Sequence, residues 1–284
     1  MAGVSMKAIK LRIKSMESTK QITKAMEMVA SSKLRRAQER IQHSRPYFEI
    51  LFDTLNKIAA NTENFESPFL ERREVRKTCY VVIGGDRGLA GGYNHNVLKL
   101  AWSCMEGKSS CVIPIGKKAL DFFRRRGSEI VTDQYAEAAE VDVGDCFTIA
   151  KLLSKGFLDG EFDEIHVVYT SFVSMLSQSP VTLQLLPLEH VFREGEHPAN
   201  CLTLYEPDSF SVFNAIIPEY LGGLVYGALC ESVTSEQGAR RTAMDSATKN
   251  AEEMISSLSL KYNRARQGAI TQEITEIVAG ADSD

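Results

Sequence analysis

The chain carries a long stretch with helical periodicity at each end, and these two stretches constrain the fold most strongly. From about Val4 to Ala60 the sequence has no glycine, and its first proline is Pro46. Apolar residues recur there every three or four positions, which places them on one face of an α-helix. As one helix the stretch would be ~85 Å long, and Pro46 is a point where it can kink. The apolar sets are Ile9, Ile13 and Met16, then Ile22, Met26 and Val29, and then Ala30, Leu34, Ala37 and Ile41.

A second helical stretch runs from about Asp208 to Val278. Asp208 or Ser209 can cap its start, because a short side-chain oxygen there accepts a hydrogen bond from a free backbone N–H. As one helix of about 70 residues it would be ~105 Å long. From Met244 onward the apolar positions follow a heptad-like spacing, and the alanines among them allow close approach of a second helix. This seam comprises Ala247, Ala251, Ile255, Leu258, Tyr262, Ala265 and Ala269, with Ile270, Ile274 and Ile277 beside it.

The middle of the chain, from about Arg76 to Tyr205, has a different pattern. Short apolar runs rich in β-branched residues alternate there with helical patterns. This alternation is typical of a mostly parallel sheet with helices on both faces. Strands are predicted for Thr78–Ile83, Ser110–Ile115, Glu164–Thr170 and Val181–Leu186, and helices around 94–105, 117–126 and 142–158.

The three zones predict an α/β protein in which a central, mostly parallel, Rossmann-like domain joins a long antiparallel coiled coil. We expect residues 1–60 to form the N-terminal coiled-coil helix, 76–205 the central domain, and 208–278 the C-terminal coiled-coil helix. The helices should pair antiparallel, because the central domain returns the chain to the same end. A rod of ~85–105 Å would far exceed the span of such a domain, so its surface needs a partner.

The N-terminal helix is strongly basic. Residues 1–45 contain 11 Lys and Arg against 3 Asp and Glu, a local charge of +8, whereas the whole chain carries −4. Nucleic acid, anionic lipid or an acidic protein surface could each bind such a segment. Aromatic residues and a nucleic-acid-reading motif are missing, so an acidic protein partner fits at least as well.

A glycine-rich loop, GGDRGLAGGYN from Gly84 to Asn94, directly follows the first predicted strand. Loops of this kind often bind phosphates. This one, however, has neither the dinucleotide-binding register nor the Gly-Lys-Ser/Thr of a P-loop. A tight strand-to-helix connection is the simpler interpretation, and Arg87 is expected to contact a neighbouring element or subunit.

Other chemistry finds little support in the sequence. The six cysteines contain no C-x-x-C pair, which fits a reducing compartment and argues against a disulfide framework or zinc site. The five histidines are isolated, so neither a metal site nor a general base is predicted. The longest apolar stretch, Ala215–Cys230, is interrupted by Pro218, Glu219 and glycines and is too short to span a bilayer. We therefore expect no catalytic, cofactor-binding or metal-binding residues.

The periodicity alone leaves several classes open. One is a structural rod or two-helix regulator, another is an enzyme with a nucleotide-binding α/β domain, and a third is a coiled-coil scaffold or nucleic-acid adaptor. Three sequence blocks bear on this choice. They are Ile9–Ser15 with Thr19–Gln38, then Gly85–Gly92 (GDRGLAGG), and finally Ser235–Thr248 with Tyr262–Ala281.

Together these blocks resemble, over nearly the whole chain, the gamma subunit of F-type ATP synthase. Gly85 and Ala90 depart from the Ser-Asp-Arg-Gly-Leu-Cys-Gly loop that is more frequent in that family, which puts only the contacts of the loop in doubt. The resemblance implies a non-catalytic rotor shaft whose coiled coil lies inside a hexamer of alternating alpha and beta subunits. It also implies that nucleotide binds on beta, and that the α/β domain lies beside the epsilon subunit and the membrane ring of c subunits.

The resemblance further implies partner contacts for individual residues. Lys24 and Met26 would lie near an acidic loop of beta, and Tyr205 and Glu206 would lie toward the c ring. The upper contact with beta would comprise Arg266, Gln267, Thr271 and Glu273.

The expected location follows from the N-terminus. It is basic and amphipathic, but it lacks the apolar core of a signal peptide, and Glu17 and Glu27 argue against a transit peptide. We expect a bacterial protein held peripherally at the cytoplasmic face of the cell membrane, with the matrix side of an organellar inner membrane as the alternative.

Overall fold

A computed structural model describes residues 6–60, 67–188 and 204–281. Its internal contacts divide the chain into two compact units. We call Met1–Ser31 with Arg240–Asp284 the helical unit, and Ser32–Ala239 the α/β unit. The division cuts both long helices, so the three sequence-based domains stay a prediction.

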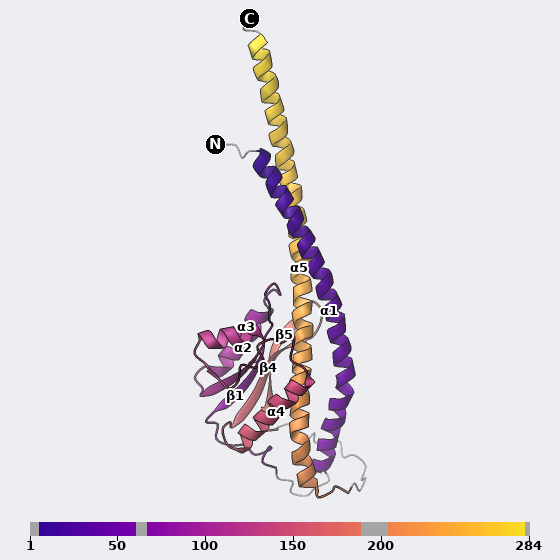
Figure 1. Cartoon of the computed structure of the whole chain (residues 1–284), viewed down its shortest axis with the longest axis vertical. Helices are drawn as coiled ribbons and strands as arrows, with labels where there is room; N and C mark the ends of the chain where they lie inside the picture. Colours follow the sequence, from indigo (N-terminus) through magenta and orange to yellow (C-terminus); the bar gives the residue numbers. More distant parts are fainter. Residues whose placement is uncertain (1–5, 61–66, 189–203, 282–284) are drawn as a thin grey trace. The chain divides into compact units, whose positions relative to one another are not determined.

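The two long terminal helices are confirmed. Helix α1 spans Met6–Ala60 and continues through Pro46, while α5 spans Ser209–Ala281 and contains Pro218 (Figure 1). Asp208 caps α5 as expected, because its carboxylate accepts hydrogen bonds from the backbone N–H of Ser211 at 2.8 Å and from the Ser211 hydroxyl at 2.7 Å.

The α/β unit contains a five-stranded sheet in the order β3-β2-β1-β4-β5. Strands β1 to β4 are parallel, and β5 returns antiparallel to β4. The expected mostly parallel α/β fold is therefore confirmed. The strands are β1 Thr78–Ile83, β2 Ser110–Ile115, β3 Glu129–Ile130, β4 Glu164–Phe172 and β5 Gln178–Leu186, and the shorter helices are α2 Tyr93–Met105, α3 Lys117–Arg125 and α4 Val143–Leu158.

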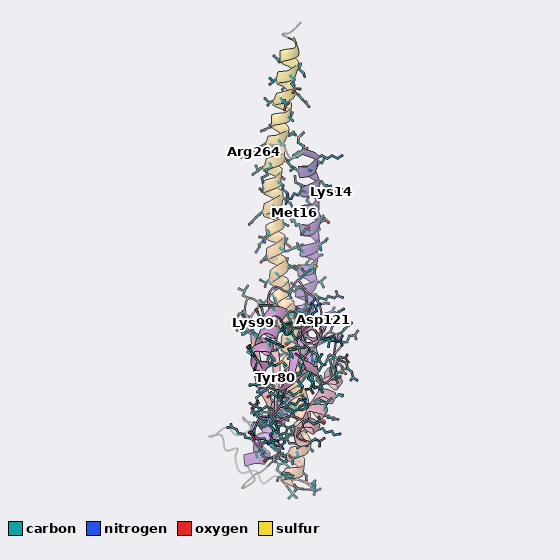
Figure 2. The ribbon with its side chains drawn as sticks, turned by 90° about the vertical axis from the view of Figure 1, so that its left-hand side faces the viewer. Lys14, Met16, Tyr80, Lys99, Asp121 and Arg264 are labelled. Atoms are coloured by element: carbon teal, nitrogen blue, oxygen red, sulfur yellow. The ribbon has the colours of Figure 1, made fainter. Side chains whose placement is uncertain are left out.

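Both faces of the sheet are covered, as the near-continuous apolar strands require. Along β1, Val81 and Ile83 pack into one core with α4, the end of α1 and the first turns of α5. Figure 1 shows α4 and α5 beside the sheet. The alternate residues Tyr80 and Val82 pack into a second core with α2 and α3. In Figure 2, Tyr80 lies within this unit, with Lys99 and Asp121 labelled on α2 and α3.

Helix α5 is long and apolar enough to cross a bilayer, judged by length and composition alone, because its best window has a mean hydropathy of 1.3. Packing within the α/β unit explains this apolar character. Phe213, Ile217 and Leu221 are fully buried in the first core. The apolar segment is thus the central core helix of the unit.

In the helical unit, α1 and α5 run antiparallel. The Lys20 ammonium lies 2.8 Å from the Glu252 carboxylate, and the Thr23 and Thr248 hydroxyl oxygens are 2.7 Å apart. From the first contact to the second, the residue number rises on α1 from 20 to 23 and falls on α5 from 252 to 248, so the two helices are antiparallel. Figure 2 shows Lys14 and Met16 on α1 and Arg264 on α5.

One expected apolar set does not lie in the seam between these helices. Ile22 and Val29 are 58% and 56% exposed, and Met26 is half-buried, whereas Thr23 is buried. The set does share one helix face, but that face is turned outward because Thr23 occupies the seam through its hydrogen bond to Thr248. We call Ile22, Met26 and Val29 the outer stripe.

Candidate functional site

The Gly84–Asn94 loop leaves the C-terminal end of β1 and is held by polar side chains. The Asp86 carboxylate accepts three backbone hydrogen bonds, from Lys117 at 3.2 Å, Ala138 at 2.8 Å and Ala139 at 3.1 Å. The Asn94 side chain accepts from the Gly85 N–H at 2.8 Å and donates to the Arg87 carbonyl at 3.2 Å. The loop is therefore fastened to the start of α3 and to the turn before α4.

Two glycines of this region permit close approach of the backbone. A Cβ at Gly116, where φ is 93°, would lie 2.3 Å from the Gly84 carbonyl oxygen. A Cβ at Gly85 would lie 2.9 Å from the carboxyl group of Glu236 on α5. The interpretation of the loop as a tight strand-to-helix connection is confirmed.

The same loop directs two side chains outward. Arg87 is exposed, and Leu89 is 63% exposed with a φ of 63°, a left-handed conformation that is uncommon for leucine. The carboxylate of Asp86 accepts from the first backbone N–H of α3, at Lys117, and helix N-termini of this kind are where phosphates often bind in other proteins. The geometry thus favours contact with another surface at Arg87 and Leu89.

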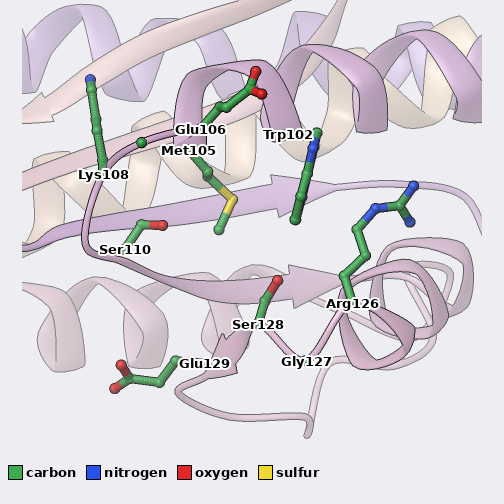
Figure 3. Close-up of a pocket in the computed structure, with 10 residues that line it drawn as sticks. Trp102, Met105, Glu106, Lys108, Ser110, Arg126, Gly127, Ser128 and Glu129 are labelled. Carbon is green, nitrogen blue, oxygen red and sulfur yellow. The ribbon is translucent and has the colours of Figure 1, made fainter.

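A pocket of about 360 Å³ lies elsewhere in the α/β unit, between the ends of α2 and α3 (Figure 3). Its walls include Trp102 and Met105, and Ser110 and Glu129 lie where β2 and β3 begin. The Arg126 guanidinium stacks 3.6 Å from the centre of the Phe122 ring. Open α/β sheets bind nucleotides at the carboxyl ends of their strands, so this pocket is at the wrong edge for such a site.

The titratable groups of the α/β unit have structural roles. Burial raises the pKa of the Cys146 thiol to about 12 and also raises that of Cys230, which makes both weak nucleophiles. His166 stacks on Tyr80 with ring centres 5.4 Å apart and lies 3.3 Å from the Glu164 carboxylate. Among the described residues, no group of three or more His, Cys, Asp or Glu side chains could hold a metal ion.

In the helical unit, Lys24 lies two residues from both Ile22 and Met26, about half a turn around α1, so it projects from the face opposite the outer stripe. Its ammonium lies 2.9 Å from the Glu27 carboxylate, and this hydrogen bond raises the pKa of Lys24 above its usual 10.5. Lys24 therefore stays charged at physiological pH.

In the last turns of α5, most of the side chains that the structure describes are exposed. Arg266, Gln267, Thr271 and Glu273 all lie there, with the Thr271 hydroxyl donating to the Gln267 carbonyl at 2.9 Å. Ile270, Ile274 and Ile277 follow helical spacing, and Ile277 is 71% exposed. We call these three isoleucines the terminal stripe. An apolar stripe of this kind at the end of a helix marks a binding surface.

The remaining predicted contacts lie at the start of α5. Tyr205 is half-buried and packs against the first core, whereas Glu206 is exposed just before the Asp208 cap. The predicted contact residues therefore form separate surfaces on the two units. Sequence reasoning missed Asp86, which holds the glycine-rich loop. The only available signal was the position of Asp86 directly after the glycines.

Comparison with known proteins places this geometry in a family. A family model described as ATP synthase matches residues 5–283. The ATP synthase gamma chain of Ruminococcus albus is 46% identical over 99% of each chain. The sodium-ion-specific ATP synthase gamma chain of Acetobacterium woodii is 41% identical over 97% of each chain.

Solved structures agree on the fold. A chain of the Euglena gracilis mitochondrial ATP synthase, in its OSCP/F1/c-ring structure, superposes with a TM-score of 0.65 at 18% identity, covering 98% of this chain and 94% of that one. A chain of the Tetrahymena thermophila central stalk and c-ring superposes with a TM-score of 0.56 at 23% identity, covering 80% of this chain and 99% of that one.

Proposed function

The chain belongs to the ATP synthase gamma-chain family, and we propose how its surfaces let it work as the central rotor shaft of an F-type ATP synthase. Ion flow through the membrane ring turns the shaft, and ATP is made or hydrolysed on the beta subunits. The chain itself is a non-catalytic subunit. The match to gamma chains over nearly its whole length carries this conclusion.

Coupling requires that the shaft contact each beta subunit differently. A ligand or partner can shift a conformational equilibrium only through its differential affinity for the two states. The helical unit is suited to this because its exposed surface is unequal around the axis. The outer stripe lies on one face of α1, whereas the end of α5 carries both the terminal stripe and polar residues.

We assign the contacts as follows. Lys24 and Met26 meet an acidic loop of beta, since Lys24 is an exposed cation and lies within one helical turn of Met26 on α1. The exposed polar residues at the end of α5 and the terminal stripe meet the upper part of the hexamer. That polar set comprises Arg266, Gln267, Thr271 and Glu273.

On the α/β unit, Arg87 contacts the hexamer or the epsilon subunit from the exposed glycine-rich loop. Tyr205 and Glu206 lie toward the c-subunit ring. The complex is membrane-associated, and we place this chain peripherally on the cytoplasmic side of a bacterial cell membrane, which the bacterial relatives support.

Co-expression with the alpha and beta subunits of one bacterial enzyme tests this assignment. We expect the chain to copurify with them and to raise ATP hydrolysis above that of alpha and beta alone. Ile274→Asp should weaken retention of the chain in the complex. Gln272→Asp adds the same charge on the opposite face of α5 and is the matched control. Retention that is equally weakened by both changes, or by neither, would contradict a terminal-stripe contact.

A further inference from the structure

Helix α5 takes the place of a neighbouring strand along the last residues of β4, beyond the end of β1. Strand β1 pairs with β4 only as far as Val82 opposite Val168, but β4 continues to Phe172. On its other side, Thr170 is opposite Pro180 of β5. Proline has no backbone N–H to donate, so Pro180 offers the Thr170 carbonyl no hydrogen bond.

Two serines of α5 bind the backbone groups of Thr170. The Ser232 hydroxyl accepts a hydrogen bond from the Thr170 N–H at 3.1 Å, and the Ser235 hydroxyl donates to the Thr170 carbonyl at 3.1 Å. Both serines are fully buried. Their spacing of three residues places them on one face of the helix, so a single strand residue is bound at both of its backbone groups.

The contact continues one step along the strand. The Phe172 N–H donates to the Glu231 carboxylate at 3.4 Å. Residues 170 and 172 direct their N–H groups to the same side of β4 because alternate strand residues do so. Ser232, Ser235 and Glu231 therefore bind the side of β4 that faces β1, beyond the point where the pairing with β1 ends. We call these three residues the strand lock.

The strand lock differs physically from the packing elsewhere along α5. Phe213, Ile217 and Leu221 hold the helix through apolar contact, which is non-directional and permits small rotations. Hydrogen bonds require a narrow range of distance and angle. The strand lock therefore fixes the angle of α5 about its own axis relative to the sheet.

We propose that Ser232 and Ser235 are positioning residues that carry torque between the sheet and α5. The proposal rests on the rotor function above. A load that twists α5 against the sheet is resisted first at the strand lock, because the apolar contacts yield to rotation before the hydrogen bonds do.

The test uses the complete ATP synthase in membrane vesicles, with ATP-driven ion pumping normalised to ATP hydrolysis. Ser232→Ala with Ser235→Ala removes both hydroxyls from Thr170. Thr234→Val is the matched control, because Thr234 is equally buried on the same turn but donates within its own helix, to the Cys230 carbonyl at 2.8 Å. Thermal unfolding of each isolated chain measures the effect on the fold.

We expect the double variant to keep hydrolysis while pumping per ATP falls about twofold. Each lost hydrogen bond raises about fivefold the fraction of molecules in which α5 is released from Thr170. Thr234→Val should pump like the unchanged chain. An unchanged ratio in the double variant, or an equal fall in Thr234→Val, would overturn the proposal. If the double variant does not assemble, Ser235→Ala alone is judged by the same criteria. Failure of the unchanged chain to pump would instead contradict the rotor function.

Discussion

The hydroxyl oxygens of Thr23 on α1 and Thr248 on α5 lie 2.7 Å apart in the seam of the helical unit and share a hydrogen bond, although 225 residues separate the two threonines in the chain. Both side chains are buried. One hydroxyl donates to the other, and the threonine that accepts donates its own hydrogen to a carbonyl of its helix, either Thr23 to Lys20 at 3.1 Å or Thr248 to Met244 at 2.8 Å. A polar pair thus takes a position that apolar residues fill elsewhere, and it fixes the register of the two helices.

This pair predicts a measurable coupling. In a double-mutant cycle with Thr23→Val and Thr248→Val, we expect an interaction free energy of about 1 kcal/mol. Loss of helical circular dichroism on heating is the measurement. Thr19→Val is the control, because the Thr19 hydroxyl is exposed and donates only to the Ser15 carbonyl at 3.0 Å. A coupling near zero would mean that the two hydroxyls act independently.

A second prediction concerns the close approach beneath the glycine-rich loop. Gly116→Ala should destabilise the chain by about 3 kcal/mol or more, because its Cβ meets a backbone oxygen that cannot move aside. Gly107→Ala shares a positive φ of 75° but has open space around it. It should cost only about 1 kcal/mol. Denaturant unfolding of both variants compares them, and equal losses would show that conformation alone requires glycine at position 116.

The start of α5 should depend on pH through Asp208. The N–H and hydroxyl of Ser211 hold the pKa of this carboxyl below its usual 3.8. A lowered pKa means that the stabilisation is present above that value and is lost as pH falls through the folded pKa. We expect Asp208→Ala to lower the melting temperature at neutral pH, with the difference shrinking below about pH 4.

Asp208→Asn separates the charge from the cap. The amide can still accept the Ser211 hydrogen bond but does not titrate in this range. Its difference from Asp208→Ala should therefore vary little with pH. If Asp208→Ala were equally destabilising at neutral pH and near pH 3, the carboxylate would not be the source of the stabilisation.

The outer stripe predicts an effect on coupling. Met26→Lys would add a cation to the outer stripe, facing the acidic loop proposed on beta, and each pair of a lysine with a carboxylate would contribute ~0.2–1 kcal/mol if exposed. The free energy of the shaft would then have deeper minima at the rotation angles where this lysine meets the loop, and rotation would be slower at those angles. We expect hydrolysis to persist while ion pumping per ATP falls, with partial recovery at high salt because salt screens the pair. Met26→Leu should behave like the unchanged chain, and an unchanged ratio in Met26→Lys at low salt would remove this contact from the account.

Local patterns predicted much of the fold. Thr78–Ile83 and Ser110–Ile115 are strands as expected, because continuous apolar runs bounded by turns have few other solutions. Strand β3 was missed, since it consists of only Glu129 and Ile130, which pair with Cys111 and Val112. A strand of two residues is too short to show a periodicity in the sequence.

Long-range polar contacts were beyond sequence reasoning. The spacing at Ile22 and Val29 indicated a helical stripe, but the partner of Thr23 lies on a distant segment, so the seam position could not be read. The bonds between Thr170 and the serines of α5 were hidden for the same reason. The contact residues stay predictions because their partners are other chains.

Direct observation of rotation tests the central claim. A probe fixed to an exposed residue of the α/β unit, such as Lys99, would be followed while the alpha and beta subunits are held on a surface. We expect unidirectional rotation that begins on addition of Mg-ATP, stops when ATP is removed, and keeps pace with hydrolysis. A probe that stays at a fixed angle while the same complexes hydrolyse ATP would contradict the account.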